Sequence, residues 1–154
     1  MYQFYKALNI YTFVYRCYTG VQMNTEEHRR ALRESLDEIK IAVQTGIEKK
    51  QRTIGINCSL AAIDMLEIYL HSQGLIDPGA NIKHDFFSSV SKARNKIRPN
   101  FENRDNIIRL LCELENKRNI LIYGKAQKRE IIEKYLDIFN SIKDLFIEMG
   151  VEYE

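Results

Sequence analysis

The apolar positions of this chain recur every three or four residues rather than every second residue, which places them on one face of an α-helix. Five such runs follow one another from Thr25 onward, and no segment shows the alternation of a half-buried strand. We therefore predict five helices, at about 25–49, 54–72, 81–97, 103–123 and 127–149.

Capping and breaking residues set the predicted helix ends. Asn24 or Thr25 can cap the first helix, and Glu26 and Glu27 then lie near the positive end of its dipole. Pro99 ends the third helix because it disfavours helical geometry in the residue before it. The other predicted breaks are Gly74, the 77–79 turn, Gly124 and Gly150.

Each predicted helix carries one apolar face. The face consists of Leu32, Leu36, Ile39, Val43 and Ile47 in the first helix, Phe86, Val90, Ala93 and Ile97 in the third, and Ile131, Tyr135, Ile138, Ile142, Leu145 and Met149 in the fifth. Long helices joined by short connections pack as antiparallel neighbours. The sequence thus predicts an all-α fold, an up-and-down antiparallel bundle of four to five helices formed by residues 23–154.

Residues 1–22 differ in composition from the rest and hold five of the nine tyrosines. They lack the organisation of a signal peptide, and their apolar runs are too short to span a bilayer. Three interpretations stay open for this aromatic N-terminal extension. It is an extra helix or strand that packs by its aromatic rings, an arm that binds a partner, or an upstream extension with Met23 as the natural start.

Composition narrows the class of protein. A chain of 154 residues, 45% hydrophobic and 29% charged, is typical of one soluble globular domain. The formal charge of +2 comes from Lys6 and Arg16, so residues 23–154 are neutral overall and net charge does not indicate nucleic-acid binding. Cys17, Cys58 and Cys112 have neither disulfide-framework nor zinc-knuckle spacing, which favours a reducing cytoplasm.

Arg118 is the most informative polar residue because it continues the apolar face of the fourth helix. A guanidinium stays charged and is rarely buried without a carboxylate or another anion beside it. We expect it to point inward or toward a partner molecule. Two interpretations stay open: it pairs with Asp64 or Glu115 or extends to solvent, or it is a functional cation.

The segment Lys117-Arg118-Asn119-Ile-Leu-Ile-Tyr123-Gly124-Lys125, at the end of the penultimate long helix, resembles the HEPN superfamily (higher eukaryotes and prokaryotes nucleotide-binding domains). Members of that superfamily are short up-and-down helical bundles that usually dimerise. They carry an arginine followed by a polar residue and, four to six residues on, a histidine. This chain is similar to the branch in which Tyr-Gly stands in place of that histidine.

The resemblance implies a homodimer in which the Arg118 side chains of two copies meet in a cleft. Arg118 would then stabilise charge on a phosphate, Asn119 would orient it, and Tyr123 would occupy the histidine position. Many members are metal-independent ribonucleases, so these three residues are also the candidate catalytic residues. A phenol is a poor general base at neutral pH, but it still donates a hydrogen bond. A small nucleotidyltransferase, in a toxin-antitoxin type of pair, is a further implied partner.

A second group of cations is a candidate for nucleic-acid binding. Lys92, Arg94, Lys96 and Arg98 follow one another in seven residues without an acid, and Lys125 comes after the fourth helix. An ordinary solvated helix end explains the four-residue run equally well. We expect no metal and no cofactor, because His28, His71 and His84 lack ligand spacing and fit surface or cap positions.

Three functional hypotheses follow from these features. The first is a HEPN-like domain that binds RNA or a nucleotide at a dimer cleft. The second is a metal-independent endoribonuclease that uses Arg118. The third is a non-catalytic helical interaction module in which Arg118 belongs to a buried salt bridge.

Overall fold

The computed structural model describes residues 25–153, and every regular element in that range is helical. The predicted all-α class is confirmed. The elements are a helix over 25–45, α2 (Gln51–Ser72), the 3₁₀ helix η1 (His84–Ser88), α3 (Val90–Lys96), α4 (Arg104–Tyr123) and α5 (Arg129–Glu148).

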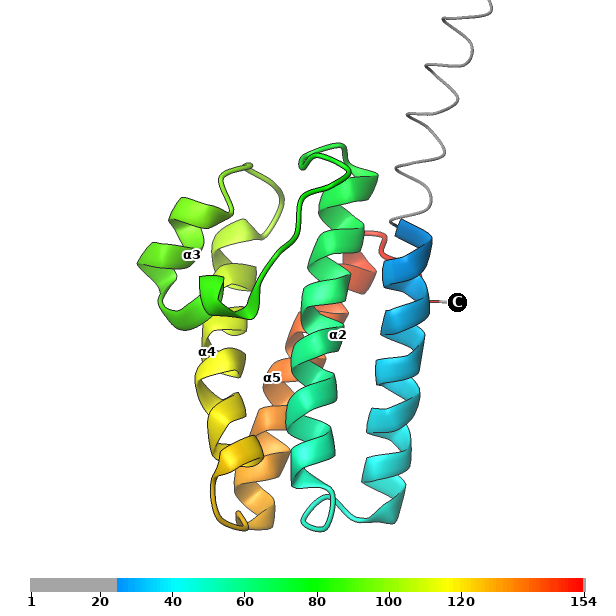
Figure 1. Cartoon of the computed structure of the whole chain (residues 1–154), viewed down its shortest axis with the longest axis vertical. Coiled ribbons are helices and arrows are strands. Elements are labelled where there is room, and N and C mark those ends of the chain that lie inside the picture. The colour runs from blue at the N-terminus through cyan, green and yellow to red at the C-terminus, as the bar shows by residue number, and fades with distance from the viewer. Residues whose placement is uncertain (1–24, 154) are drawn as a thin grey trace, which may run out of the picture.

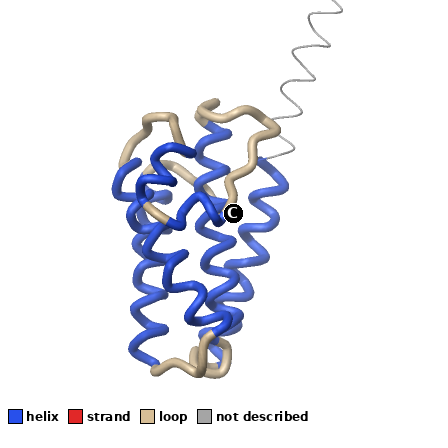
Figure 2. Tube along the Cα trace, turned by 60° about the vertical axis from the view of Figure 1, so that its left-hand side comes forward, coloured by secondary structure: helices blue, strands red, loops and turns tan. Residues whose placement is uncertain are grey.

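The four long helices run alternately down and up, as the up-and-down bundle requires (Figure 1). Helix α2 lies at the centre and packs against α4 and α5 on one side and the 25–45 helix on the other. The short elements η1 and α3 cover the first half of α4, so the last turns of α4 lie beyond that cover (Figure 2).

The central position of α2 explains its apolar sequence. By length and composition alone, α2 is apolar enough to cross a membrane, but 72% of its most apolar window is buried inside the bundle. A helix that is enclosed on most sides must be apolar on most sides. Its apolarity is therefore accounted for by packing against the neighbouring helices.

The prediction of one continuous third helix is wrong, because the structure has two short helices there. Residues 81–97 form η1 and α3, separated by Ser89 in an extended conformation with φ −154° and ψ 154°. The Ser89 hydroxyl accepts a hydrogen bond from the Lys92 amide at 3.2 Å. Serine competes for backbone groups in this way and favours a cap over a helix interior. The break turns Phe87, rather than Phe86, fully into the core.

The buried faces of the first and fifth helices also differ from the predicted ones. Val43 is 46% exposed and Ile131 is 44% exposed, although both were expected in the core. The core positions of α5 are instead Ile132, Tyr135, Phe139, Ile142 and Phe146. Helix α5 packs against both α2 and α4. Its buried face therefore includes the rings of Phe139 and Phe146 and is rotated about the helix axis relative to the predicted face.

The helix ends agree with the predicted breaks at three glycines. Gly74 and Gly150 have positive φ angles of 64° and 87°, a region that costs glycine nothing. Gly124 follows α4 directly, and a Cβ there would lie 2.3 Å from the Ile120 carbonyl oxygen. The first helix ends four residues earlier than predicted, before Gly46 with φ 122°.

Candidate functional site at the crossing of α2 and α4

Helices α2 and α4 approach each other closely at Gly55. A Cβ on Gly55 would lie 3.0 Å from Leu121 Cβ and 3.2 Å from Ile122 Cγ1, which leaves no room for a larger side chain without movement. The Tyr135 hydroxyl of α5 donates to the Gly55 carbonyl at 2.9 Å, and burial raises the pKa of that phenol. The crossing fixes the backbone of α4 at the level of Arg118, whose carbonyl faces Gly55.

Gln51, the first residue of α2, holds the end of α4 in place. Its buried amide nitrogen donates to the carbonyls of Leu121 at 3.2 Å and Lys125 at 3.1 Å. Its amide oxygen accepts from the Gln127 backbone nitrogen at 2.8 Å. The segment that follows Tyr123 is therefore tied to α2 through one side chain.

Arg118 is directed into the seam between the helices, as the sequence predicted, but its polar contacts are few. Its side chain is 25% exposed, and Nη1 lies 3.8 Å from Glu115 Oε2. Among the residues the structure describes, Nε is buried and has no hydrogen-bond partner. A guanidinium carries five N–H donors, and one long ion pair leaves capacity for a further acceptor.

Glu115 is shared by groups from three elements. Its Oε1 accepts the Ser59 hydroxyl of α2 and lies 3.1 Å from His84 Nδ1 of η1. Ser59 Oγ and His84 Nδ1 are themselves 3.0 Å apart. An ionised carboxylate only accepts, so His84 donates from Nδ1 when Glu115 is charged. Arg118 lies near the other oxygen, Oε2, so the three groups share both oxygens of one buried carboxylate.

Exposed side chains lie beside this polar network. Ser59 and Glu115 mark the side of α2 and α4 that η1 covers, and Asn119, one turn after Glu115, is exposed below it. Tyr123 follows one turn later and is 77% exposed. On α2, the exposed apolar residues Ile56 and Leu60 flank Ser59 on the same side. We call the surface formed by the exposed Ile56, Leu60, Asn119 and Tyr123, together with Arg118, the α2–α4 face.

The structure therefore brings only part of the predicted cleft together. Arg118 turns inward, whereas Asn119 and Tyr123 lie on the neighbouring, exposed side of α4. Lys125 is exposed at the end of this region, and its carbonyl accepts hydrogen bonds from the side chains of Gln51 and Gln127. Of the two carboxylates proposed as partners of Arg118, Glu115 is the one it meets.

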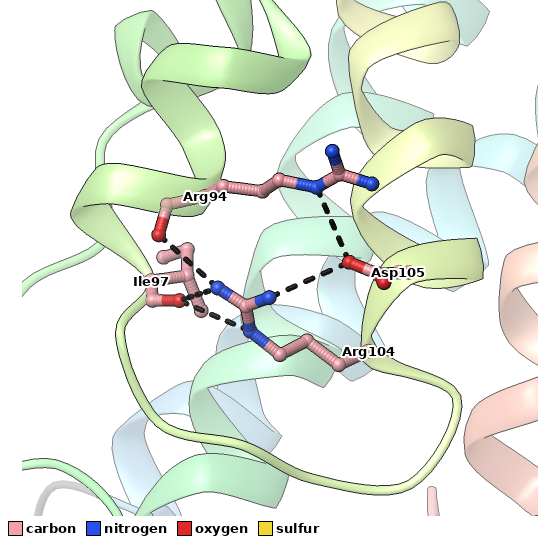
Figure 3. Close-up of polar contacts among 4 residues, drawn as sticks. All are labelled: Arg94, Ile97, Arg104 and Asp105. Atoms are coloured by element: carbon pink, nitrogen blue, oxygen red, sulfur yellow. Dashed lines mark hydrogen bonds and ion pairs between the residues drawn. The ribbon is translucent and has the colours of Figure 1, made fainter.

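The basic run of α3 is separate from Arg118 and has its own partners. Arg94 Nε lies 3.3 Å from Asp105 Oδ1, and Arg104 donates to the carbonyls of Arg94 and Ile97 (Figure 3). These contacts fasten α3 to the first turn of α4. Arg118 is 13 residues beyond Asp105, which at the helical rise places it about 20 Å further along α4.

The other cations of the run are also engaged. Lys92 Nζ lies 3.0 Å from Asp85 Oδ2, and this hydrogen bond lowers the pKa of that carboxyl. Lys96 Nζ is 5.6 Å from the centre of the Phe86 ring. Arg98 Nε donates to the Asn95 carbonyl at 3.4 Å. The run is accounted for by local contacts at the surface, although it stays accessible to solvent.

Sequence reasoning missed Ser59 and His84. We expected all three histidines at the surface or at caps, but His71 is buried and His84 joins the Glu115 network. The signal that was available is polarity within an apolar helix face, since Ser59 follows the buried Cys58 and precedes the buried Ala62 by one turn, and Glu115 lies one turn before Arg118. Burial raises the pKa of the thiols of Cys58 and Cys112, so neither is an activated nucleophile.

No family model, curated protein or solved structure matches the chain. The geometry of the α2–α4 crossing is accordingly the main support for a functional proposal. That crossing presents one under-satisfied guanidinium, an imidazole oriented by a carboxylate, and an adjacent exposed strip of apolar, amide and phenol side chains.

Proposed function

We propose that this chain is a HEPN-like helical domain that binds RNA or a nucleotide at the α2–α4 face, in a cleft formed by two copies. The observation that carries the proposal is the state of Arg118. Its side chain is 25% exposed, its guanidinium has one long ion pair of 3.8 Å, and Nε is buried without a hydrogen-bond partner among the described residues. A phosphate oxygen supplies the acceptors that this group lacks.

The surroundings of Arg118 suit a nucleotide. Asn119 offers amide donors and acceptors for a sugar or base edge. The ring of Tyr123, 77% exposed, offers a surface on which an unpaired base can stack. Partial burial strengthens the attraction between Arg118 and a phosphate, because the local dielectric is lower than that of water.

The second copy is supported by exposed apolar side chains on the same face. Ile56 and Leu60 are 36% and 41% exposed and lie next to each other on α2. A two-fold axis through the α2–α4 face would cover them and bring two Arg118 side chains to one cleft. A small nucleotidyltransferase remains the alternative occupant of this surface, as the sequence resemblance implies.

The proposal is tested by removing one positive charge at two places on α4. Arg118→Ala is compared with Arg109→Ala, a matched control because Arg109 is 60% exposed and pairs with Glu113 at the surface. Binding of a short fluorescent single-stranded RNA is followed by anisotropy. We expect Arg118→Ala to weaken binding at least about tenfold, as loss of a charge-assisted phosphate contact should, and Arg109→Ala to change it little. Equal affinities for both variants would contradict the proposal.

The two-copy cleft has its own test. Leu60→Asp places a charge among the exposed apolar residues of the face, and sedimentation velocity reports the association state. We expect the wild-type chain to sediment as a dimer and Leu60→Asp as a monomer with weaker RNA binding. If the wild-type chain sediments as a monomer and Leu60→Asp binds RNA as tightly as the wild type, the two-copy cleft is contradicted, whereas the proposed contact between Arg118 and RNA is not.

A second candidate function, a metal-independent endoribonuclease, is favoured by His84. Its Nδ1 is held by Glu115, the same carboxylate that Arg118 meets, so an imidazole and a phosphate-binding cation are linked through one group. An imidazole is the side chain best suited to proton transfer near neutral pH. This supplies the acid or base that Tyr123 cannot.

The ribonuclease hypothesis predicts RNA cleavage in the presence of a chelator. Cleavage should disappear in both Arg118→Ala and His84→Gln, while His84→Gln retains RNA binding. Tyr123→Phe serves as the control, because a phenol that only stacks should be replaceable by phenylalanine. Undiminished cleavage by His84→Gln would remove the proposed role of the imidazole.

A further inference from the structure

A second polar cluster lies at the opposite end of α2, where the 25–45 helix begins. His28 of that helix faces Asp64 and Glu67 of α2, which share one side because they are three residues apart. His28 Nδ1 lies 2.9 Å from Asp64 Oδ1 and 3.0 Å from Glu67 Oε2. The three ligand atoms, one imidazole nitrogen and two carboxylate oxygens, all lie within 4.8 Å of one another.

The two distances from His28 are those of hydrogen bonds from a protonated imidazole, and they are also close to the separations of ligands around one metal ion. First-row divalent ions bind imidazole nitrogen and carboxylate oxygen at about 2.0–2.2 Å, so neighbouring ligand atoms stand about 3.0–3.4 Å apart. We propose that His28, Asp64 and Glu67 form a site for a divalent first-row transition metal, with Zn²⁺ as the probe. The nitrogen ligand favours such ions over Mg²⁺, which prefers oxygen ligands and water.

The cluster is built as metal sites are built, with a supporting contact behind a ligand. The Ile82 amide donates to Glu67 Oε1 at 2.6 Å and fixes the carboxylate, whose other oxygen is the one near His28. The Glu67 side chain is 4% exposed, and those of Asp64 and His28 are 14% and 17% exposed. The site is thus shielded while keeping an open edge through which an ion can enter.

His71 is an independent observation that points to the same place. It lies one turn beyond Glu67 on α2, is 3% exposed, and stacks on the His28 ring with centroids 5.9 Å apart. Both of its ring nitrogens are buried, and the Ala80 backbone, the one hydrogen-bond partner within reach among the described residues, lies outside ordinary hydrogen-bond geometry. A buried imidazole with so weak a hydrogen bond is unusual, and His71 is close enough to serve as a fourth ligand if its ring, now stacked on His28, turns toward the cluster.

The ion would join three segments that are distant in sequence. His28 belongs to the 25–45 helix, Asp64 and Glu67 to α2, and Ile82 to the connection before η1. Loss of the ion should therefore loosen the first helix. This is a prediction separate from the proposed RNA site, since Glu67 lies eight residues beyond Ser59 on α2, about 12 Å along the helix axis.

The test uses the full chain, freed of metal by a chelator and then titrated with Zn²⁺ in a calorimeter. We expect one ion per chain, and binding at least about tenfold weaker in Asp64→Asn and in Glu67→Gln. Glu113→Gln is the matched control, because the Glu113 side chain is 42% exposed on α4 and pairs with the surface cations Arg109 and Lys117. Circular dichroism confirms that each variant is helical.

A spectroscopic measurement on the wild-type chain covers the case in which a variant does not fold. Co²⁺ should give visible d–d absorption that one equivalent of Zn²⁺ abolishes, and Zn²⁺ should raise the melting temperature. No saturable binding of Zn²⁺ or Co²⁺ by the wild-type chain would overturn the proposal and leave a protonated His28 that bridges two carboxylates. Zn²⁺ binding that is equal in the wild type, Asp64→Asn and Glu67→Gln would overturn it as well.

Discussion

Arg118 and Arg94 both lie on helices that pack against a neighbour, yet their guanidinium groups meet different surroundings. Arg94 is 53% exposed, sits 3.3 Å from Asp105 (Figure 3), and belongs to a run in which each cation has a partner. Arg118 is 25% exposed, lies 3.8 Å from Oε2 of a carboxylate whose Oε1 contacts Ser59 and His84, and keeps Nε buried without a hydrogen-bond partner among the described residues. We therefore expect an anion to bind at Arg118 more tightly than at Arg94, because Arg118 is less exposed and makes fewer hydrogen bonds.

The largest effect on stability is expected at Glu115, which contacts Arg118, Ser59 and His84. Glu115→Ala leaves Arg118 without its carboxylate and removes the acceptor of Ser59 and His84. Because breaking a buried charged network costs about 3–5 kcal/mol, we expect a loss of that order in urea denaturation. Glu113→Ala, at an exposed position of the same helix, should cost no more than about 0.5 kcal/mol. Equal losses for the two variants would show that the network is not buried as described.

A smaller effect is expected at the crossing itself. Gly55→Ala adds a Cβ 3.0 Å from Leu121 Cβ, and overpacking of this kind costs about 1–3 kcal/mol. Gly79→Ala is the control, since nothing lies within 4 Å of a Cβ at that position. The melting temperature of Gly55→Ala should therefore lie clearly below that of Gly79→Ala. A Gly55→Ala protein as stable as Gly79→Ala would mean that α2 and α4 are further apart at Arg118.

Arg118→Ala itself should reduce stability only slightly, by about 1 kcal/mol, since its ion pair is long and partly exposed. Glu115 keeps Ser59 and His84 as partners in this variant. If the chain is instead a non-catalytic interaction module, with Arg118 as a structural salt-bridge member, the loss in urea denaturation should approach the effect of removing Glu115. Arg118→Lys, which retains the charge, distinguishes the loss of charge from the loss of the guanidinium fork.

The smallest effect is expected in the basic run. Arg94→Ala removes a surface ion pair with Asp105, and such pairs contribute about 0–1 kcal/mol. The stability of this variant in urea should thus lie within about 0.5 kcal/mol of the wild type. A loss as large as that of Gly55→Ala would mean that α3 is held to α4 mainly by this pair.

The sequence predicted the scaffold well because helix period and glycine breaks are local signals. It failed at Ser89, where one side chain caps a new helix, and on α5, where contacts with two helices decide which residues are buried. The inward direction of Arg118 followed from its place on an apolar face, and Glu115 was identified as a partner. Local periodicity determines which residues share a face, but not how far the arc of burial extends.

The polar clusters were harder to predict because they join residues that are distant in sequence. His84 reaches Glu115 across 31 residues, and His28 reaches Asp64 across 36. Spacing along one helix gives no sign of either contact. The sequence alone therefore predicted surface or cap positions for the histidines, whereas their contacts depend on how the helices pack.

The most direct test of the account is the affinity of a short single-stranded RNA for Arg118→Ala and for Arg94→Ala, measured by anisotropy in the same salt. Both variants lose one positive charge, so a general electrostatic attraction would weaken them equally. If RNA binds at Arg118, we expect the affinity to fall at least about tenfold in Arg118→Ala and less than about twofold in Arg94→Ala. Equal losses, or a larger loss for Arg94→Ala, would contradict it.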